Sequence, residues 1–105
     1  MAWEHAQNAR VFKAFCDENR LRILECLQEG DLCACVLIQR LGIKQSALSY
    51  HMKILVEAGV VESKPFGKWT HYRICEEGCA YAQTLLGNLT AVRNHNEEVS
   101  QCAKA

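Results

Sequence analysis

Gly42 separates two short segments, residues 32–41 and 45–58, that both have the pattern of an amphipathic helix. In the second segment the apolar residues fall on one narrow stripe at about 100° per residue, and polar residues fall on the far side. The stripe consists of Leu48, Met52 and Leu55. Two short helices joined by a tight glycine turn are typical of a helix-turn-helix, so the sequence predicts this motif over about residues 32–58.

The segments on either side predict a mainly α chain with one small β-hairpin. We expect helices at about 3–15, at about 17–29 with Asp17 as N-cap, and at about 77–94. Alternating residues predict strands at about 60–64 and 68–74 around a turn at residues 65–67. The expected core residues of the outer helices are Trp3, Ala6, Phe12, Phe15, Leu21, Leu24, Leu27, Tyr81, Leu85, Leu89 and Val92.

The chain has 105 residues, half of them hydrophobic, which fits one compact domain and argues against most large enzymes. A domain of this size often shares its stability with a second subunit, so we expect a dimer. Nothing later in the chain covers the apolar stripe of the last helix, which should therefore pack on the first helix or on a partner. No apolar run is long enough for a membrane span and the N-terminus does not have the pattern of a signal peptide, so we expect a cytoplasmic protein.

Positive charge is concentrated in the middle of the chain. Residues 40–73 carry six Lys or Arg against two Glu, a net charge of +4, whereas each flank carries −2 and the whole chain is neutral. A basic segment that contains a helix-turn-helix is the pattern of a nucleic-acid-binding surface.

The chain contains seven cysteines, which is many for a protein of a reducing compartment. Because the number is odd, they cannot all pair as disulfides within one chain. We therefore expect free thiols or metal-bound thiolates. A thiol oxidoreductase would need a Cys-x-x-Cys pair near a βαβ unit, and neither is present, so we predict no enzymatic activity and no organic cofactor.

Residues 17–74 resemble the ArsR/SmtB family of winged-helix metal-responsive repressors. Four segments in order carry the resemblance, DENRLRIL from Asp17, DLCACVL from Asp31, QSALSYHMK from Gln45 and GKWTHYR from Gly67. The resemblance implies one winged-helix domain over residues 1–105 with the hairpin, residues 60–74, as the wing. It also implies a homodimer, formed through the N- and C-terminal helices, that binds double-stranded operator DNA and releases it when a metal or metalloid binds.

The far side of segment 45–58 presents the polar groups that a helix needs to contact DNA in the major groove. An ordinary solvated helix face would have a similar composition. With the resemblance, the predicted contacts from this helix and the hairpin are Lys44, Gln45, Ser46, Ser49, Tyr50, His51, Lys53, Lys64 and Lys68. His51 lies nearest to the apolar stripe, Lys44 stands where the family more often has a capping residue, and Trp69 and Tyr72 are expected to pack the wing onto the core.

Cys33 and Cys35 are the candidate sensing site, because soft thiolates bind soft ions. A Cys-x-Cys pair at this position of the family suggests trivalent arsenic or antimony as the inducer. Zinc, cadmium, lead, a methylated trivalent arsenical, a disulfide redox switch and two plain buried thiols are alternatives. Residues two apart on an intact helix point about 200° apart, so we expect the start of segment 32–41 to unwind when both sulfurs bind one atom.

Some arsenic-sensing members have a third cysteine three positions after the second, where this chain has Ile38. Candidates for a third ligand are Cys16, Cys75, Cys79 and Cys102, and a two-thiolate site would suit a monomethyl arsenical. Cys26 is expected to be a core residue. His95 and Glu98 match half of a second family site for zinc, but Ala82 and Thr84 stand where its other half should be, so we expect no zinc there.

Overall fold

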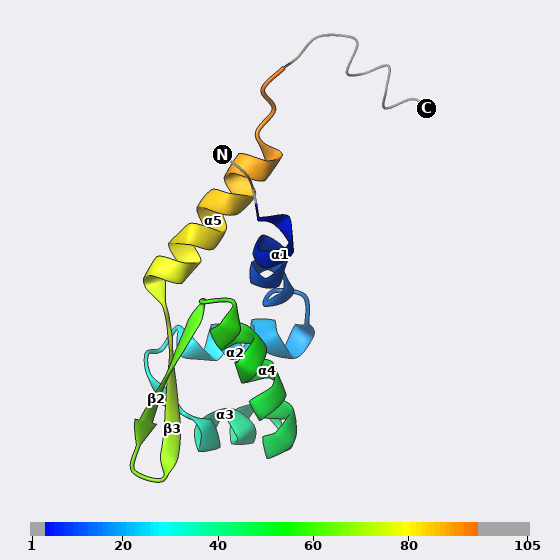
Figure 1. The fold of residues 1–105 in the computed structure, drawn as a ribbon. Coiled ribbons are helices and arrows are strands. Elements are labelled where there is room, and N and C mark those ends of the chain that lie inside the picture. Colours follow the sequence, from blue (N-terminus) through cyan, green and yellow to red (C-terminus); the bar gives the residue numbers. More distant parts are fainter. Residues whose placement is uncertain (1–3, 95–105) are drawn as a thin grey trace.

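The computed structural model describes residues 4–94 (Figure 1). The elements in chain order are α1 (His5–Lys13), α2 (Glu18–Leu27), β1 (Leu32–Cys33), α3 (Ala34–Leu41), α4 (Gln45–Glu57), β2 (Val61–Phe66), β3 (Trp69–Ile74) and α5 (Glu76–Thr90). This is the predicted fold class, with α3 and α4 as the helix-turn-helix and β2 and β3 as the wing. Within residues 4–94 no helix has the length and apolar character that a bilayer crossing requires. The expectations for Trp3, His95, Glu98 and Cys102 lie outside the described residues.

The main core lies between the helix-turn-helix, α2 and the base of the wing. Its fully buried side chains include the whole predicted stripe of α4. They are joined by Ile23 of α2, Leu37 of α3 and Val60 before β2. The helical period of 3.6 residues predicts the buried face of α4 correctly, because α4 buries only one side.

The expected core faces of α1 and α2 are partly wrong. Ala6, Phe15 and Leu21 are exposed, whereas Val11, Ala14 and Ile23 are buried. The reason is that α1 contacts both α4 and α5, so its buried face is set by two neighbours that the sequence does not identify. Asn8 is buried as well, and the Tyr81 hydroxyl satisfies it by donating a hydrogen bond to its Oδ1 at 2.8 Å.

A three-stranded antiparallel sheet in the order β1-β3-β2 forms the wing and its base. Leu32 and Cys33 pair with Tyr72 and His71 of β3, so the expectation that a helix begins at residue 32 is wrong and α3 begins at Ala34. The turn is also shorter and begins two residues later than expected, at residues 67–68, because β2 continues through Pro65 and Phe66. Proline is tolerated there since β2 is an edge strand.

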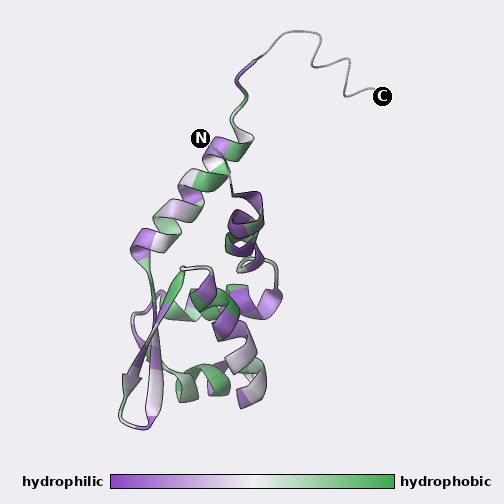
Figure 2. Ribbon diagram, in the orientation of Figure 1, coloured by the Kyte–Doolittle hydropathy of each residue, from purple (hydrophilic) through white to green (hydrophobic). Residues whose placement is uncertain are grey.

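Different elements lie at the two ends of the molecule, and α5 at one end is only partly covered. Figure 1 shows α1 and α5 together at one end, and the start of α4 and the tip of the wing at the other. Figure 2 shows apolar residues recurring along α5. Of the predicted stripe only Leu85 is buried, with Ala82 and with Val11 of α1. Tyr81, Leu89 and Val92 are 53%, 45% and 66% exposed, and so is the neighbouring Leu86 at 53%.

Candidate functional site

The outer face of α4 carries a group of exposed polar side chains. Lys44 precedes the helix in an extended conformation and makes no side-chain capping bond, as its residue type predicts. The exposed residues of this face are Gln45, Ser46, Ser49, Tyr50 and Lys53. Gln45 and Ser46 lie in the first turn of the helix, where unpaired backbone amides and the helix dipole favour contact with phosphate. The face can therefore contact both base edges and the DNA backbone.

His51 does not belong to this exposed face. Its residue is only 8% exposed, and its Nδ1 lies 3.0 Å from Nη1 of Arg20 and 3.8 Å from Oδ2 of Asp17. Because the guanidinium has no acceptor, Arg20 donates to Nδ1, and the proton of a neutral imidazole then resides on Nε2. A base contact by His51 is excluded by this burial, which corrects the expectation from the sequence.

Arg20 joins three elements at the buried side of α4. Its Nε and Nη2 donate to the carbonyl oxygen of Lys13 at the end of α1, at 3.3 and 3.1 Å, while Nη1 contacts His51 of α4. The sequence does not single out Arg20, because an arginine in the first turn of a helix is usually a solvated side chain. Arg20 thus fixes the position of α4 relative to the α1–α2 junction.

Asp17 is the N-cap of α2, as predicted. Its Oδ2 accepts from the backbone amides of Asn19 at 2.8 Å and Arg20 at 3.2 Å. Desolvation alone would raise the pKa of Asp17, but these two amides and the positive charge of Arg20, with a further contribution from His51 when its ring is protonated, outweigh it and lower the pKa below its usual value.

The wing carries exposed lysines and exposed aromatic residues. Lys64 and Lys68 are exposed, and Tyr72 packs against the main core as expected. Trp69 does not pack on the core, because it lies at the start of β3 beside the turn and remains 49% exposed. The expectation that Trp69 anchors the wing is therefore wrong.

Cys33 and Cys35 lie together at the junction of β1 and α3. Cys33 is the N-cap of α3, with extended backbone angles, and its Sγ accepts hydrogen bonds from the backbone amide of Cys35 at 3.4 Å and from the Cys35 thiol at 2.7 Å. The bond from the Cys35 thiol holds the pKa of Cys33 below its usual value and raises the pKa of Cys35. Cys33 is half-buried and Cys35 exposed, so a small thiophilic species can reach both sulfurs.

This geometry corrects the expectation that the helix must unwind before the two sulfurs can meet. The 200° separation applies only when both residues are helical, and Cys33 precedes the first turn of α3. Two sulfurs bound to one ion at 2.3 Å in a tetrahedral arrangement lie about 3.8 Å apart. The two sulfurs are therefore already near enough to hold one ion without unwinding of α3.

The third-ligand candidates that fall within residues 4–94 lie elsewhere. Cys16 is exposed at the α1–α2 junction, and Cys79 in α5 points its Sγ at the carbonyl of Val60, 3.6 Å away. Cys75 follows His71, the strand partner of Cys33, by four residues, or about 13 Å at 3.3 Å per residue. Within the part of the chain that the structure describes, no three His, Cys, Asp or Glu side chains are grouped to hold a metal ion. Cys26 is partly buried against the main core, as expected.

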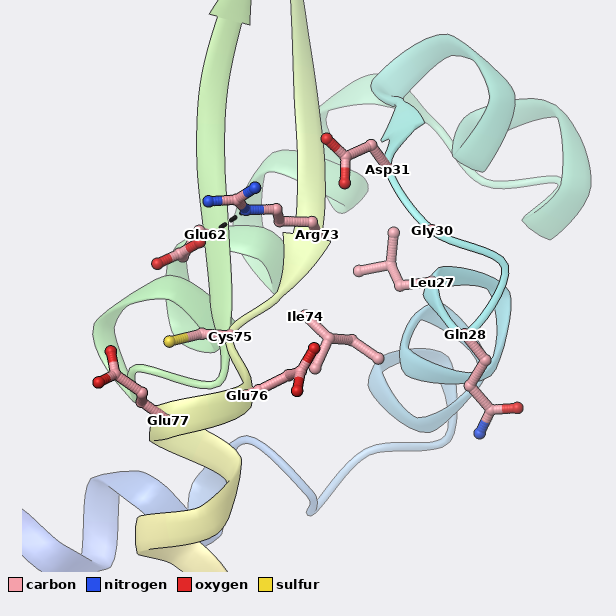
Figure 3. Close-up of a pocket in the computed structure, with 10 residues that line it drawn as sticks. All are labelled: Leu27, Gln28, Gly30, Asp31, Glu62, Arg73, Ile74, Cys75, Glu76 and Glu77. Atoms are coloured by element: carbon pink, nitrogen blue, oxygen red, sulfur yellow. Dashed lines mark hydrogen bonds and ion pairs between the residues drawn. The ribbon is translucent and has the colours of Figure 1, made fainter.

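Cys75 instead lines an open hollow of about 620 Å³ between the end of α2, the base of β3 and the start of α5 (Figure 3). Four carboxylates and one arginine also line it, namely Asp31, Glu62, Glu76, Glu77 and Arg73. Arg73 donates to Glu62 at 2.8 Å, so its charge is already paired. An acidic hollow would repel DNA, which leaves the start of α4 and the wing tip as the surface suited to a polyanion.

Comparisons with known proteins agree with this architecture. Residues 17–63 match the model of the family described as bacterial regulatory protein, arsR family. The chain is 39% identical over 75 residues to an uncharacterised HTH-type transcriptional regulator of Methanocaldococcus jannaschii, covering 70% of this chain and 84% of that protein. It is 40% identical over 67 residues to the arsenical resistance operon repressor of Bacillus subtilis, covering 63% of this chain and 64% of the repressor. The solution structure of a homodimeric winged helix-turn-helix DNA-binding domain from Mycobacterium bovis superposes with a TM-score of 0.63 at 25% identity, covering 87% of this chain and 89% of that one.

Proposed function

The chain belongs to the arsR family of bacterial transcriptional regulators, which are DNA-binding proteins and not enzymes, and from this premise we propose that it is a metalloid-responsive repressor. A homodimer binds operator DNA and is released when trivalent arsenic or antimony binds Cys33 and Cys35. The observation that carries the inducer site is the 2.7 Å separation of the two sulfurs at the point where the wing sheet meets α3. We further propose that residues 1–105 act as a single DNA-binding and dimerisation domain in the cytoplasm, where thiols are kept reduced.

Operator binding uses α4 in the major groove and the wing beside it. The contacts from α4 and its N-cap are Lys44, Gln45, Ser46, Ser49, Tyr50 and Lys53, and those from the wing are Lys64 and Lys68. Their exposure, the net charge of +4 over residues 40–73 and their common end of the molecule support this assignment. Because several contacts are ionic, affinity falls steeply as the salt concentration rises.

The dimer forms through α1 and α5. Tyr81, Leu86 and Leu89 leave a row of exposed apolar surface on α5, at the end of the molecule opposite to the DNA-binding surface. Burying such a row against its equivalent in a second copy gives an interface with twofold symmetry. The two α4 helices are then held at a fixed spacing that matches two operator half-sites.

Release follows from where the thiol pair is attached. Cys33 is paired with His71 in the wing sheet on one side, and on the other it caps α3, which packs on α4 through the core. When both sulfurs bind the inducer, the Cys33 sulfur no longer accepts from the amide and the thiol of Cys35, and the start of α3 shifts. The shift changes the position of α4 relative to the wing, and a coupling free energy of about 1–3 kcal/mol is typical of such a change. Reciprocity requires DNA to weaken inducer binding by the same factor.

The pair supplies two thiolates, and no third His, Cys, Asp or Glu is grouped with them within residues 4–94 of the same chain, so the third bond of arsenic needs a ligand from elsewhere. Cys102 and a cysteine of the second subunit are the candidates for inorganic arsenite. A trivalent monomethyl arsenical needs none, since carbon already occupies one of its bonds. Replacement of Cys102 by Ser should weaken arsenite binding while leaving methylarsenite binding unchanged if Cys102 is the third ligand.

Equilibrium dialysis with arsenite under a phosphine reductant tests the inducer site. We expect one arsenic per chain for wild type and for Cys16→Ser, and none for Cys33→Ser or Cys35→Ser. Cadmium, lead and zinc are tested in the same cells, and a metal that binds while arsenite does not would replace arsenic as the inducer. Undiminished arsenite binding by Cys33→Ser would refute the proposed site.

A redox switch is the second candidate function, and the same sulfur geometry favours it. The Cys33 sulfur, with its lowered pKa, would attack hydrogen peroxide to give a sulfenic acid and hydroxide, and the Cys35 thiol would then displace water to form the disulfide. Release of DNA by peroxide, with no effect of arsenite under reductant, would favour this function over the metalloid sensor.

A further inference from the structure

Two aromatic side chains at the tip of the wing are exposed and have no role in the core. Phe66 and Trp69 are direct strand partners on either side of a two-residue turn, and they are 66% and 49% exposed. Gly67 is the first turn residue and has a φ of +66°, the conformation that a type II′ hairpin turn requires at this position. The turn therefore holds the two rings side by side at the tip.

Phe66 and Trp69 lie on the outer face of the sheet. Residues alternate along a strand, and Tyr72 and Ile74 of β3 pack against the core, so Trp69 and His71 project to the opposite side. The His71 ring stacks on the Phe66 ring, with 4.7 Å between the ring centroids and 29° between the ring planes. One face of Phe66 is thus backed by the imidazole, which stiffens a ring that is otherwise open to solvent.

The charge around these rings indicates what they contact. Lys68 stands in the turn between them, and Lys64 is the strand partner of His71 on the same face. The nearest carboxylate on this face of β2, Glu62, is paired with Arg73 farther from the tip. An apolar tip flanked by two cations is complementary to a polyanion with apolar steps inside it, as in the minor groove of DNA. The tip also lies at the same end of the molecule as the start of α4 (Figure 1).

We propose that Phe66 and Trp69 form an apolar wedge that enters the minor groove of the operator next to the groove occupied by α4. Phe66 partly unstacks one base step, Trp69 packs against the adjacent sugar and base edge, and Lys64 and Lys68 contact the phosphates on the two sides. Apolar wedges of this kind kink the duplex toward the major groove. The inference rests on the proposed DNA-binding function and adds to it a deformation of the operator.

Affinity and salt dependence distinguish a wedge from a purely ionic wing. The probe is the duplex that the wild-type dimer selects from a random-sequence pool. We expect Phe66→Ala and Trp69→Ala to weaken binding about tenfold, the loss typical of one base–aromatic contact, with the salt slope unchanged. Lys68→Ala, the matched control, should reduce the salt slope by about one. Thermal unfolding should shift only slightly in both aromatic variants, because the two rings contact each other and His71 but not the core.

Two spectroscopic measurements report the wedge directly. In a Trp3→Phe background, Trp69 is the sole tryptophan, and its emission should be quenched by the selected duplex. A 2-aminopurine placed in the duplex opposite the wing should brighten on binding of the wild type, because unstacking relieves its quenching, and should stay dark with Phe66→Ala.

Unchanged affinity in both aromatic variants, or a 2-aminopurine signal that does not depend on Phe66, would overturn the wedge. If wild type binds the duplex while these results are negative, the wedge fails and the proposed repressor function stands. If wild type selects no duplex at all, the repressor function itself fails. Binding of a protein partner that Phe66→Ala abolishes, with DNA affinity unchanged, would assign the tip to a protein interaction and also overturn the wedge.

Discussion

Replacing His51 by Leu tests whether the Arg20 contact fixes α4. Arg20 and His51 are 5% and 8% exposed, and Arg20 Nη1 lies 3.0 Å from His51 Nδ1. Leucine has a similar volume but no acceptor, so the buried guanidinium loses one of its partners and keeps only the carbonyl of Lys13. A hydrogen bond from a charged donor contributes about 1.5–3 kcal/mol, and we expect a loss of about 2 kcal/mol in the free energy of unfolding.

His51→Asn is the matched control, because the Asn side-chain oxygen can accept at the position of Nδ1. The assay is thermal unfolding at one fixed protein concentration, since the stability of a dimer depends on concentration. For a domain of this size about 2 kcal/mol corresponds to a decrease in Tm of roughly 10 °C for His51→Leu. His51→Asn should lose less than half of that. In an Arg20→Met background the effect of His51→Leu should shrink, since the partner is already absent.

Equal destabilisation by His51→Leu and His51→Asn would refute this reasoning, because the loss would then reflect packing and not the hydrogen bond. An unchanged effect of His51→Leu in the Arg20→Met background would refute it as well. Either result would remove Arg20 from the set of residues that position the DNA-reading helix.

Three other predictions concern separate parts of the molecule. The pKa of Asp17 is lowered in the folded state, so its carboxylate stabilises the fold above the pKa of the unfolded chain, and this stability is lost as pH falls through the folded pKa. Urea midpoints of wild type should therefore fall more steeply below about pH 4 than those of Asp17→Asn. Parallel curves would contradict the assignment. Iodoacetamide should alkylate Cys33 before Cys35 near neutral pH, and in Cys35→Ala the pH at which Cys33 alkylation is half-maximal should rise toward the ordinary thiol value. Mass spectrometry of the peptides measures both, and an unchanged midpoint would show that Cys35 does not lower the pKa of Cys33. Leu86→Glu with Leu89→Glu should give monomers in sedimentation velocity. Ala80→Glu with Gln83→Glu, at exposed positions on the opposite side of the same helix, should leave the dimer intact, and a dimer in both would place the interface elsewhere.

The elements predicted well from the sequence are those whose signal is local. The stripe of Leu48, Met52 and Leu55 is regular because α4 buries one side only, and Asp17 caps α2 because its carboxylate reaches amides two and three residues ahead. Alternation in the hairpin likewise located β3 and its inward-facing Tyr72.

Features that depend on distant pairing were not predictable in the same way. The strand at Leu32 and Cys33 has two residues, too few for any periodic pattern, and it exists because β3, nearly forty residues later, pairs with it. That pairing, not the helix, brings the two sulfurs together. The sequence places His51 at the edge of the polar face of α4, because it does not show that Arg20 contacts His51 on the buried side. Trp69 was expected inside because aromatic residues usually are buried, but its place beside the turn leaves it outside the core.

The most direct test of the central claim is release of DNA by arsenite, followed by fluorescence anisotropy of the labelled selected duplex under a phosphine reductant. We predict that one equivalent of arsenite per chain releases the duplex from wild type and from Cys16→Ser. Cys33→Ser and Cys35→Ser should bind the duplex with wild-type affinity and stay bound at the same arsenite concentration. Release from Cys33→Ser at the wild-type arsenite concentration would contradict the claim that the paired sulfurs at the β1–α3 junction control the affinity for DNA.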